Sequence, residues 1–290
     1  MELPVVVGVD GSESSLRAVD WAADEAALRG VPLRLVFASL WEHYEGSQLA
    51  EALGKQSERV RAQNIMDSVA LRAHRRQADV KVSTHVEPEE PDYVLVRESR
   101  SASLLVTGNR GRTGLAEALL GSVSLTVAGH AHCPMVVVRG DHDDRTLPGT
   151  YDRIVLGVGE GPTAPVAVRF AVEEAQRRRV PVEALRAWRC PAHESTDHPL
   201  LTGEPARLHE QRAVEDLEAA LKEVPADVDL RRRTVEGHPR TVLVEASHRA
   251  GLLVIGARRG QRHFGLQLGR VAHGVLHHSA CPVAIVPERA

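Results

Sequence analysis

The stretch that decides the fold is Val5-Val-Val-Gly-Val-Asp10, a short β-branched run that ends in a glycine, a valine and an acid. It occurs a second time as Ile154-Val-Leu-Gly-Val-Gly159. Other segments recur at a nearly constant distance along the chain: Val31-Pro32 with Val180-Pro181, Leu104–Gly108 with Leu252–Gly256, and His130–Pro134 with His278–Pro282. Internal similarity of this kind indicates a duplicated structural unit. We therefore predict two tandem copies of one domain.

Within each copy, short apolar runs alternate with segments of helical periodicity. In the first copy we expect strands over Val5–Val9, Leu33–Leu40, Val80–Val86, Leu104–Thr107 and Met135–Arg139, and helices over Ser14–Arg29, Ser57–Arg76, Tyr93–Arg100 and Gly121–Ala131. A continuous β-branched run is typical of a strand that is buried on both faces. Strands that alternate with helices predict an α/β fold, in which helices cover both faces of a parallel sheet.

A polar segment separates the two copies. Residues 141–150 combine charged side chains with a closing Pro and Gly, which is the composition of a linker. We therefore expect one domain over residues 1–140, a linker over 141–150 and a second domain over 151–290.

Composition excludes several classes of protein and partner. The 290 residues are 43% hydrophobic and 26% charged, which is ordinary for a globular protein and unlike a collagen, a disordered chain or a disulfide scaffold. The formal charge of -3 supplies no basic field for nucleic acid or for an anionic membrane. Aromatic residues make up only 3%, too few for a platform on which bases could stack. We expect neither nucleic acid nor membrane as a partner.

Cysteine usage and the amino terminus predict the compartment. Cys133, Cys190 and Cys281 are an odd number of cysteines without a C-x-x-C pair, which fits a reducing environment. The amino terminus has no basic segment followed by an apolar core, and no apolar run reaches the roughly 18 residues that span a bilayer. We therefore expect a cytoplasmic protein.

Unusual residues follow two of the predicted strands in the first copy. The first strand ends in Gly8-Val9-Asp10-Gly11-Ser12, and the fourth is followed by Gly108-Asn-Arg-Gly111-Arg-Thr-Gly114 and then by Gly121-Ser122-Val123-Ser124. Ligands of open α/β sheets bind beyond the carboxyl ends of the strands. The glycines allow a close backbone approach to a ligand, and the start of a helix favours an anion. Arg110 and Arg112 would add positive charge, while an acid such as Asp10 suits ribose hydroxyls or a metal held by phosphates.

The spacing Gly108-x2-Gly111-x9-Gly121-Ser122 resembles the ATP-binding signature of the universal stress protein family. The Val-Gly-Val-Asp10-Gly-Ser opening and the His-Cys-Pro134-Met-Val-Val-Val ending are similar to the same family, and the similarity covers nearly the whole chain as two copies. The resemblance implies a five-stranded parallel sheet in each domain, with the strand order 3-2-1-4-5. It also implies a nucleotide-binding regulator of stress, dormancy or growth arrest without strong catalysis. Domains of this kind pair through their last strands, either within one chain or in a homodimer.

The resemblance also implies a role for individual residues. Asp10 would face the ribose and phosphates, and the backbone of Ala38 would meet adenine, while Gly8 would keep the first strand clear of the ligand. The phosphates would lie against Gly108, Gly111, Gly121, Ser122, Val123 and Ser124, and the same loop contains Asn109, Arg110, Arg112 and Gly114. ATP is the expected ligand; an accompanying Mg²⁺ and cyclic AMP as an alternative are left open. A slow ATPase or adenylate-handling enzyme and a scaffold without a ligand remain the competing functions.

The second copy departs from this signature. Gly159 replaces Asp10, Arg259 replaces Gly111, Arg270 replaces Ser122 and Ala272 replaces Ser124. A side chain at position 259 obstructs close backbone approach, and the loss of the acid removes a ribose partner. We predict that the second domain does not bind ATP as the family does. The alternative is an anion pocket of a different kind, formed by Arg258, Arg259, Arg262 and Arg270.

Overall fold

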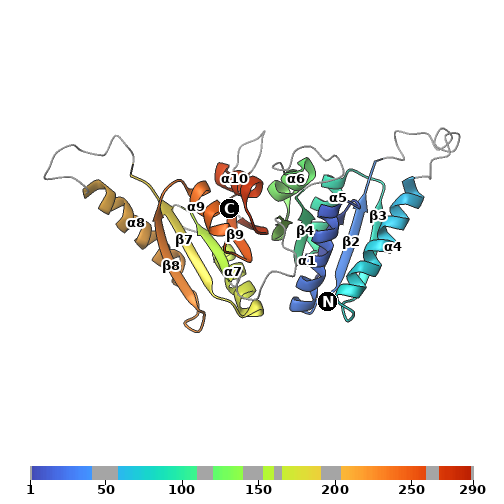
Figure 1. Cartoon of the computed structure of the whole chain (residues 1–290), viewed down its shortest axis with the longest axis horizontal. Coiled ribbons are helices and arrows are strands. Elements are labelled where there is room, and N and C mark those ends of the chain that lie inside the picture. Colours follow the sequence, from blue (N-terminus) through green and yellow to red (C-terminus); the bar gives the residue numbers. More distant parts are fainter. Residues whose placement is uncertain are drawn as a thin grey trace. The chain divides into compact units, whose positions relative to one another are not determined.

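The computed structural model describes residues 2–40, 58–109, 120–139, 153–159, 165–190, 204–258 and 268–288 (Figure 1). The chain divides into two compact units, and the division falls after Arg139. Each unit is an α/β structure with a parallel sheet, which confirms the predicted fold class. The residues of the predicted linker lie outside the described ranges.

In the first unit, the elements follow one another as the hydrophobic pattern predicts. They are β1 Val5–Val9, α1 Glu13–Arg29, β2 Leu33–Ala38, α4 Glu58–Arg76, β3 Val82–Glu87, α5 Pro91–Glu98, the short 3₁₀ helix η1 Ser99–Ser101, β4 Leu104–Gly108, α6 Ser122–His130 and β5 Met135–Val138. The described strands lie in the order β3-β2-β1-β4-β5, and every neighbouring pair is parallel. This is the order that the family resemblance implies.

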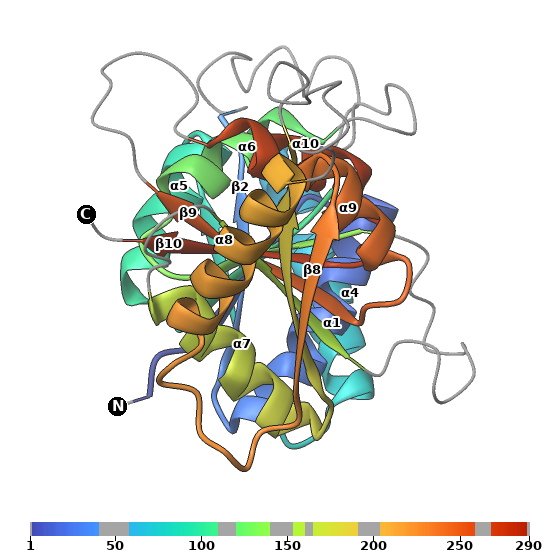
Figure 2. The ribbon, with the colours of Figure 1, turned by 90° about the vertical axis from the view of Figure 1, so that its left-hand side faces the viewer.

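The second unit repeats the arrangement. Its elements are β6 Ile154–Val158, α7 Pro165–Arg178, β7 Val182–Trp188, α8 Glu204–Ala220, β8 Leu230–Glu236, α9 Pro239–Ser247, β9 Leu252–Arg258, α10 Arg270–His278 and β10 Val283–Glu288. The described strands lie in the order β8-β7-β6-β9-β10. Figure 2 shows α8 beside β8 in this unit. The duplicated sequence therefore forms the same sheet twice.

The two faces of the first sheet are covered by different helices. A Cβ atom added at Gly8 of β1 would meet Leu95 of α5, whereas one added at Gly108 of β4 would meet Ser14 of α1. Helix α1 packs against α4, and α5 packs against α6. The central strands β1 and β4 are buried on both faces, and Val5–Val7 and Leu104–Val106 have no exposed surface. A sheet with both faces covered needs strands of this continuous apolar kind.

Several predicted boundaries move by two residues, among them the end of the second strand, which is Ala38 and not Leu40. The third strand begins at Val82 and not at Val80, because the N–H of Val80 donates to the carbonyl of Gln77 (3.4 Å) in a turn after α4. The following helix begins at Pro91, two residues before the predicted start. Proline is well suited to the first turn of a helix, since it has no N–H to leave without an acceptor.

The buried cysteines predict a loss of stability at alkaline pH. Cys133 and Cys281 precede β5 and β10, and burial raises the pKa of each thiol from its ordinary value of 9.0 to about 12. Below pH 9 both the folded and the unfolded chain keep these protons. Between about pH 9 and 12 only the unfolded thiols ionise, so rising pH favours unfolding. At pH 10 we expect each thiol to lower the free energy of unfolding by about 1 kcal/mol.

Urea unfolding at pH 8 and pH 10 measures this effect. The double variant Cys133→Ala/Cys281→Ala is the control, because it lacks both thiols and should lose less stability between the two pH values than the native chain does. An equal loss in both proteins would show that other groups cause the pH dependence.

Candidate nucleotide site

A cavity of about 260 Å³ opens at the carboxyl edge of the first sheet. Its walls come from the ends of three strands and from the starts of three helices: Gly8, Val9, Asp10, Val36, Ala38, Thr107, Gly108, Ser15, Pro91, Leu95, Gly121, Ser122, Val123 and Ser124. The structure thus brings Gly8, Asp10, Ala38 and Gly108 together with the segment 121–124, although they are far apart in the sequence. Arg110, Gly111, Arg112 and Gly114 lie outside the described residues.

Asp10 is held by the turn that joins β1 to α1. Its Oδ1 accepts hydrogen bonds from the backbone N–H (3.0 Å) and the hydroxyl (2.6 Å) of Ser12. Gly11 lies between them with φ +81°, a left-handed conformation that favours glycine. Ser12 is also the N-cap of α1, where its Oγ accepts from the N–H of Ser15 (3.2 Å). The carboxylate of Asp10 is therefore oriented at the edge of the cavity before any ligand binds.

Glycine at position 8 also has a role in helix packing. A Cβ atom on Gly8 would lie 2.9 Å from Cδ1 of Leu95, so it is the side chain of α5 that needs the space. The second copy supports this explanation, because a Cβ on Gly157 would lie 3.1 Å from Leu243 of α9. The second copy thus keeps Gly157, although it has lost other residues of the binding signature. Gly8 lines the cavity, and its missing side chain also leaves room for Leu95, which lines the same cavity.

Gly108 and Asn109 join β4 to α1 and α6. A Cβ on Gly108 would meet the hydroxyl of Ser14 and would lie 2.6 Å from its carbonyl oxygen, so α1 could not pack in this way against a larger residue. Asn109 is buried and is not part of the cavity lining. Its Oδ1 accepts from the hydroxyl of Ser14 (3.0 Å), and its carbonyl accepts from the N–H of Gly121 (2.9 Å). Asn109 therefore ties the end of β4 to α1 and to the start of α6.

The start of α6 presents backbone donors to the cavity. Gly121 is the N-cap residue, with no side chain to accept from the first turn, so the helix leaves N–H groups of Ser122, Val123 and Ser124 without an intrahelical acceptor. Ser122 is exposed, whereas Ser124 is buried and its Oγ donates to the carbonyl of Gly108 (2.9 Å). The hydroxyl proton of Ser124 is thus engaged within the fold. What Ser124 can offer a ligand is its backbone N–H.

Thr107 is a lining residue that the sequence analysis missed. Its side chain is 4% exposed, and its Oγ1 has no hydrogen-bond partner within the described part of the chain. A buried hydroxyl without a partner is costly, and it is a group that a bound molecule can satisfy. Strand periodicity was the available signal, because residues that alternate along a strand share a face. Gly108 faces α1, so its neighbour Thr107 faces the cavity.

The corresponding edge of the second sheet has lost these features. Gly159, at the position of Asp10, is exposed and offers no side chain. Arg270 is the first residue of α10 and is exposed, and Ala272 has no hydroxyl to bind Gly256. A Cβ on Gly256 would meet the carboxylate of Glu288. Arg259 and Arg262, which the alternative anion pocket requires, lie outside the described residues.

The described ranges contain neither a helix suited to a membrane nor a cluster of metal-binding side chains. Among these residues no helix has the length and apolar character needed to cross a membrane. In the same ranges, no three side chains of His, Cys, Asp or Glu are grouped so that they could hold a metal ion.

Comparison with known proteins places this site in context. The model of the universal stress protein family matches the chain twice, over residues 2–139 and 150–287. The chain is similar to a universal stress protein of Mycolicibacterium smegmatis, with 32% identity over 99% of this chain and 98% of that protein. A universal stress protein of Mycobacterium tuberculosis H37Rv is also 32% identical, over 98% and 97%. The fold is similar to that of a universal stress protein from Archaeoglobus fulgidus, with a TM-score of 0.66, 17% identity and 99% of both chains covered.

Proposed function

This chain belongs to the universal stress protein family, and we propose that its first domain binds ATP in the cavity at the carboxyl edge of β1, β2 and β4. The proposal rests on three kinds of polar group that line this cavity together. A carboxylate, the buried hydroxyl of Thr107, which has no partner among the described residues, and the backbone donors of α6 all line one space. These groups suit a ligand that has an apolar face, hydroxyls and an anionic end.

Each part of the nucleotide has a matching wall. The adenine would lie between the apolar side chains of Val36 and Leu95, with the backbone of Ala38 at its edge. The ribose would face Asp10, because an oriented carboxylate accepts hydrogen bonds from hydroxyl groups. The phosphates would lie at the start of α6, where free N–H groups and the helix dipole favour negative charge.

We propose retention of the nucleotide, and not its turnover, as the function. Among the described residues of the cavity wall Asp10 is the acid, and its Oδ1 already accepts two hydrogen bonds from Ser12. A carboxylate held in this way is a better anchor for hydroxyls than a base for an attacking water. Release of phosphate in a single turnover, above the uncatalysed rate, would instead favour a slow ATPase.

Titration of the purified chain with ATP tests the proposal, with bound nucleotide counted per chain. We expect one nucleotide per chain, because the second domain lacks the acid and the serines of the first. Parallel titrations with cyclic AMP and with ATP in the presence and absence of Mg²⁺ identify the preferred form. Two nucleotides per chain would overturn the assignment of the second domain, and no bound nucleotide would overturn the function itself.

The variant Thr107→Val tests whether the unpartnered hydroxyl contributes to binding. Valine keeps the shape of the side chain and removes the hydroxyl, so the ATP affinity should fall by roughly 2- to 10-fold, the value of one hydrogen bond. The free energy of unfolding without nucleotide should not fall, since the hydroxyl has no partner to lose within the described residues. Calorimetric titration and urea unfolding measure the two quantities. Unchanged affinity would place Thr107 outside the binding site.

A further inference from the structure

The two units differ in the charge of their edge strands, β3 and β8, each of which lies at an end of the strand order. Because Val31-Pro32 matches Val180-Pro181, the strand registers place Ser83–His85 of β3 where β8 has Arg231–Arg233. Charged side chains on an edge strand hinder its pairing with another chain. The second unit has this protection, whereas β3 has no Asp, Glu, Lys or Arg from Val82 to Val86.

β3 is open to solvent on both of its faces. His85 lies opposite Val36, which lines the nucleotide cavity on the α5 side of the sheet. Ser83 and His85 therefore point to the α5 face, while Thr84 and Val86 point to the face that α4 covers. All four are exposed, and Val86 is 42% exposed although it lies on the α4 face. Neither helix therefore covers the middle of the edge strand.

The outward backbone groups of β3 belong to Val82, Thr84 and Val86. The carbonyls of Lys81 and Glu87 accept hydrogen bonds from the β2 side, at 2.9 and 3.2 Å, so the odd-numbered residues of β3 pair with β2. The even-numbered residues between them turn their N–H and C=O groups away from β2. No residue of the described ranges pairs with these groups on the outer side.

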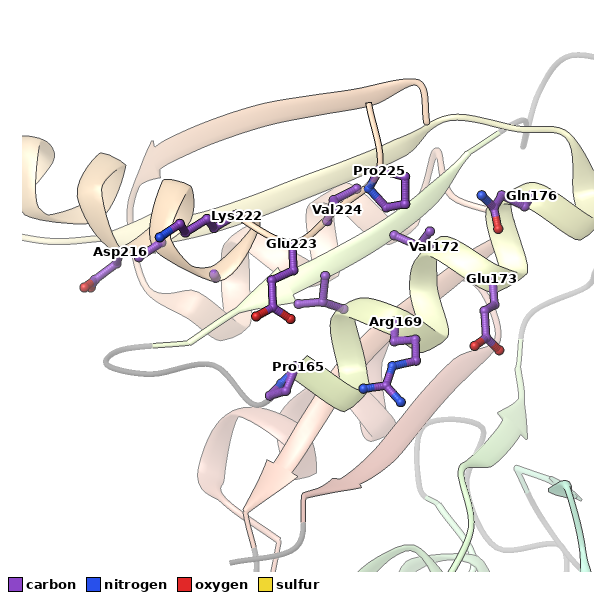
Figure 3. Close-up of a pocket in the computed structure, with 13 residues that line it drawn as sticks. Pro165, Arg169, Val172, Glu173, Gln176, Asp216, Lys222, Glu223, Val224 and Pro225 are labelled. Carbon is purple, nitrogen blue, oxygen red and sulfur yellow. The ribbon is translucent and has the colours of Figure 1, made fainter. Parts of the chain in front are cut away.

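The helices behind the two edges also differ in how they are held. α4 packs against β3 and is tied to α1, because Arg72 donates to Asp20 (2.6 Å) and Arg76 donates to Asp24 (2.7 Å). At the matching place of the second unit, a cavity of about 750 Å³ lies between α7 and α8 (Figure 3). A strand whose support is already fixed loses less freedom when a partner binds. The edge of the first unit is therefore the better template for pairing.

Two copies of β3 can meet in an antiparallel register centred on Thr84. Val82 then lies opposite Val86 of the second copy, so the outward N–H and C=O groups of both strands find partners. Ser83 lies opposite His85 of the second copy. Pairs of β-branched residues that lie directly opposite each other stabilise an antiparallel sheet. The strand is thus complementary to itself in this register.

The charges that flank the strand are complementary in the same register. Lys81 lies opposite Glu87 of the second copy, and both residues point to the α5 face. Glu87 also pairs with Arg97 (3.0 Å) and keeps 30% of its side chain exposed, so it can accept from a lysine as well. The equivalent register of β8 would instead set Arg231 opposite Arg233 of the second copy, and like charges in that position are destabilising.

We propose that β3 is a self-association edge, which pairs with β3 of a second copy of this chain about a two-fold axis at Thr84. The contact extends the sheet of the first unit across two chains. It lies at the opposite end of that sheet from β5, the last strand, through which the family resemblance implies pairing. β8 does not form the contact, because its arginines repel one another.

Sedimentation velocity over a series of concentrations of the full chain tests the proposal. We expect an equilibrium between monomer and dimer. Thr84→Arg gives β3 the central charge of β8 and sets two arginines against each other at the axis, so the dimer Kd should rise roughly 10-fold. Thr84→Val keeps a β-branched residue without a charge and should dimerise as the native chain does. A native chain that stays monomeric would overturn the proposal and leave the edge to an extended peptide of another protein.

Exchange of the flanking charges tests the register. Lys81→Glu and Glu87→Lys each set like charges opposite one another, so each variant alone should have a Kd roughly 10-fold above that of the native chain. An equimolar mixture of the two variants restores opposite charges at both pairs and should recover the native Kd, while circular dichroism checks the folding of each. A dimer that Thr84→Arg leaves intact, or a mixture no tighter than its components, would show that the chains associate elsewhere.

Discussion

The variant Gly108→Ala will destabilise the first domain far more than the matching variant Gly256→Ala destabilises the second. The two glycines occupy equivalent positions near the ends of β4 and β9, but they have different neighbours. A Cβ on Gly108 would lie 2.6 Å from the carbonyl oxygen and 2.7 Å from the carbonyl carbon of Ser14, which are backbone atoms at the start of α1. A Cβ on Gly256 would meet the end of the Glu288 side chain, which can rotate away.

The expected cost follows from this difference. Relieving the clash at Gly108 requires α1 to move away from the sheet, and overpacking of this kind costs about 1–3 kcal/mol or more. The same shift would displace Ser14 from Asn109, whose carbonyl holds the start of α6. We therefore expect Gly108→Ala to weaken ATP binding as well, although the added methyl group would face α1 and not the cavity.

Urea unfolding of the two variants measures the effect on stability. Gly159→Ala is a third comparison, because a Cβ there meets nothing within 4 Å and should change the free energy of unfolding little. If Gly108→Ala and Gly256→Ala lowered stability equally, the close contact between β4 and α1 would not be the reason for glycine at position 108.

The variant Ser122→Asp will separate nucleotide binding from stability. Ser122 is the exposed first residue of α6 and lines the cavity at the end where we propose the phosphates. A carboxylate there would repel a phosphate, and at an effective dielectric constant near 20 such repulsion amounts to a few kcal/mol. We expect the ATP affinity to fall about 100-fold. The same carboxylate complements the helix dipole, so the free energy of unfolding without nucleotide should stay unchanged or rise by about 0.3–1 kcal/mol.

Ser122→Asn is the matched control, since it has nearly the same shape as aspartate and no charge. It should reduce the affinity much less than Ser122→Asp does. Arg270→Asp changes the equivalent residue of the second domain and should leave ATP binding unaffected. A loss of affinity in Arg270→Asp, or full affinity in Ser122→Asp, would mean that the phosphates lie elsewhere.

Much of the fold could be predicted because its signals are local and occur twice. The run Val5–Val9 and its copy Ile154–Val158 are continuous apolar strands, as a sheet covered on both faces requires. The order of the strands was implied by the family resemblance and not by these patterns. Two of the boundaries that moved, at Val82 and Pro91, depend on turn hydrogen bonds and on helix capping, which hydrophobic periodicity does not record.

The candidate site was harder to predict, because the role of a residue depends on what stands opposite it. Ser122 and Ser124 look alike in the sequence, but one hydroxyl is exposed and the other is bonded to Gly108. Thr107 carries no motif, and it became a candidate through its burial and the lack of a hydrogen-bond partner among the described residues. Spacing indicates which residues gather at the edge of a sheet. It does not indicate which of their atoms are already engaged by the protein.

The duplication, the alternation of strands and helices and the loss of Asp10 and Gly111 from the second copy could all be identified in the chain, because each depends on residue type and spacing alone. The folded structure was needed to show that Leu95 packs against Gly8 and that Ser14 packs against Gly108. The physical reason is that close packing and hydrogen bonding act between residues that are distant in sequence. The neighbours that decide the role of a glycine or a hydroxyl therefore become known only when the chain is folded.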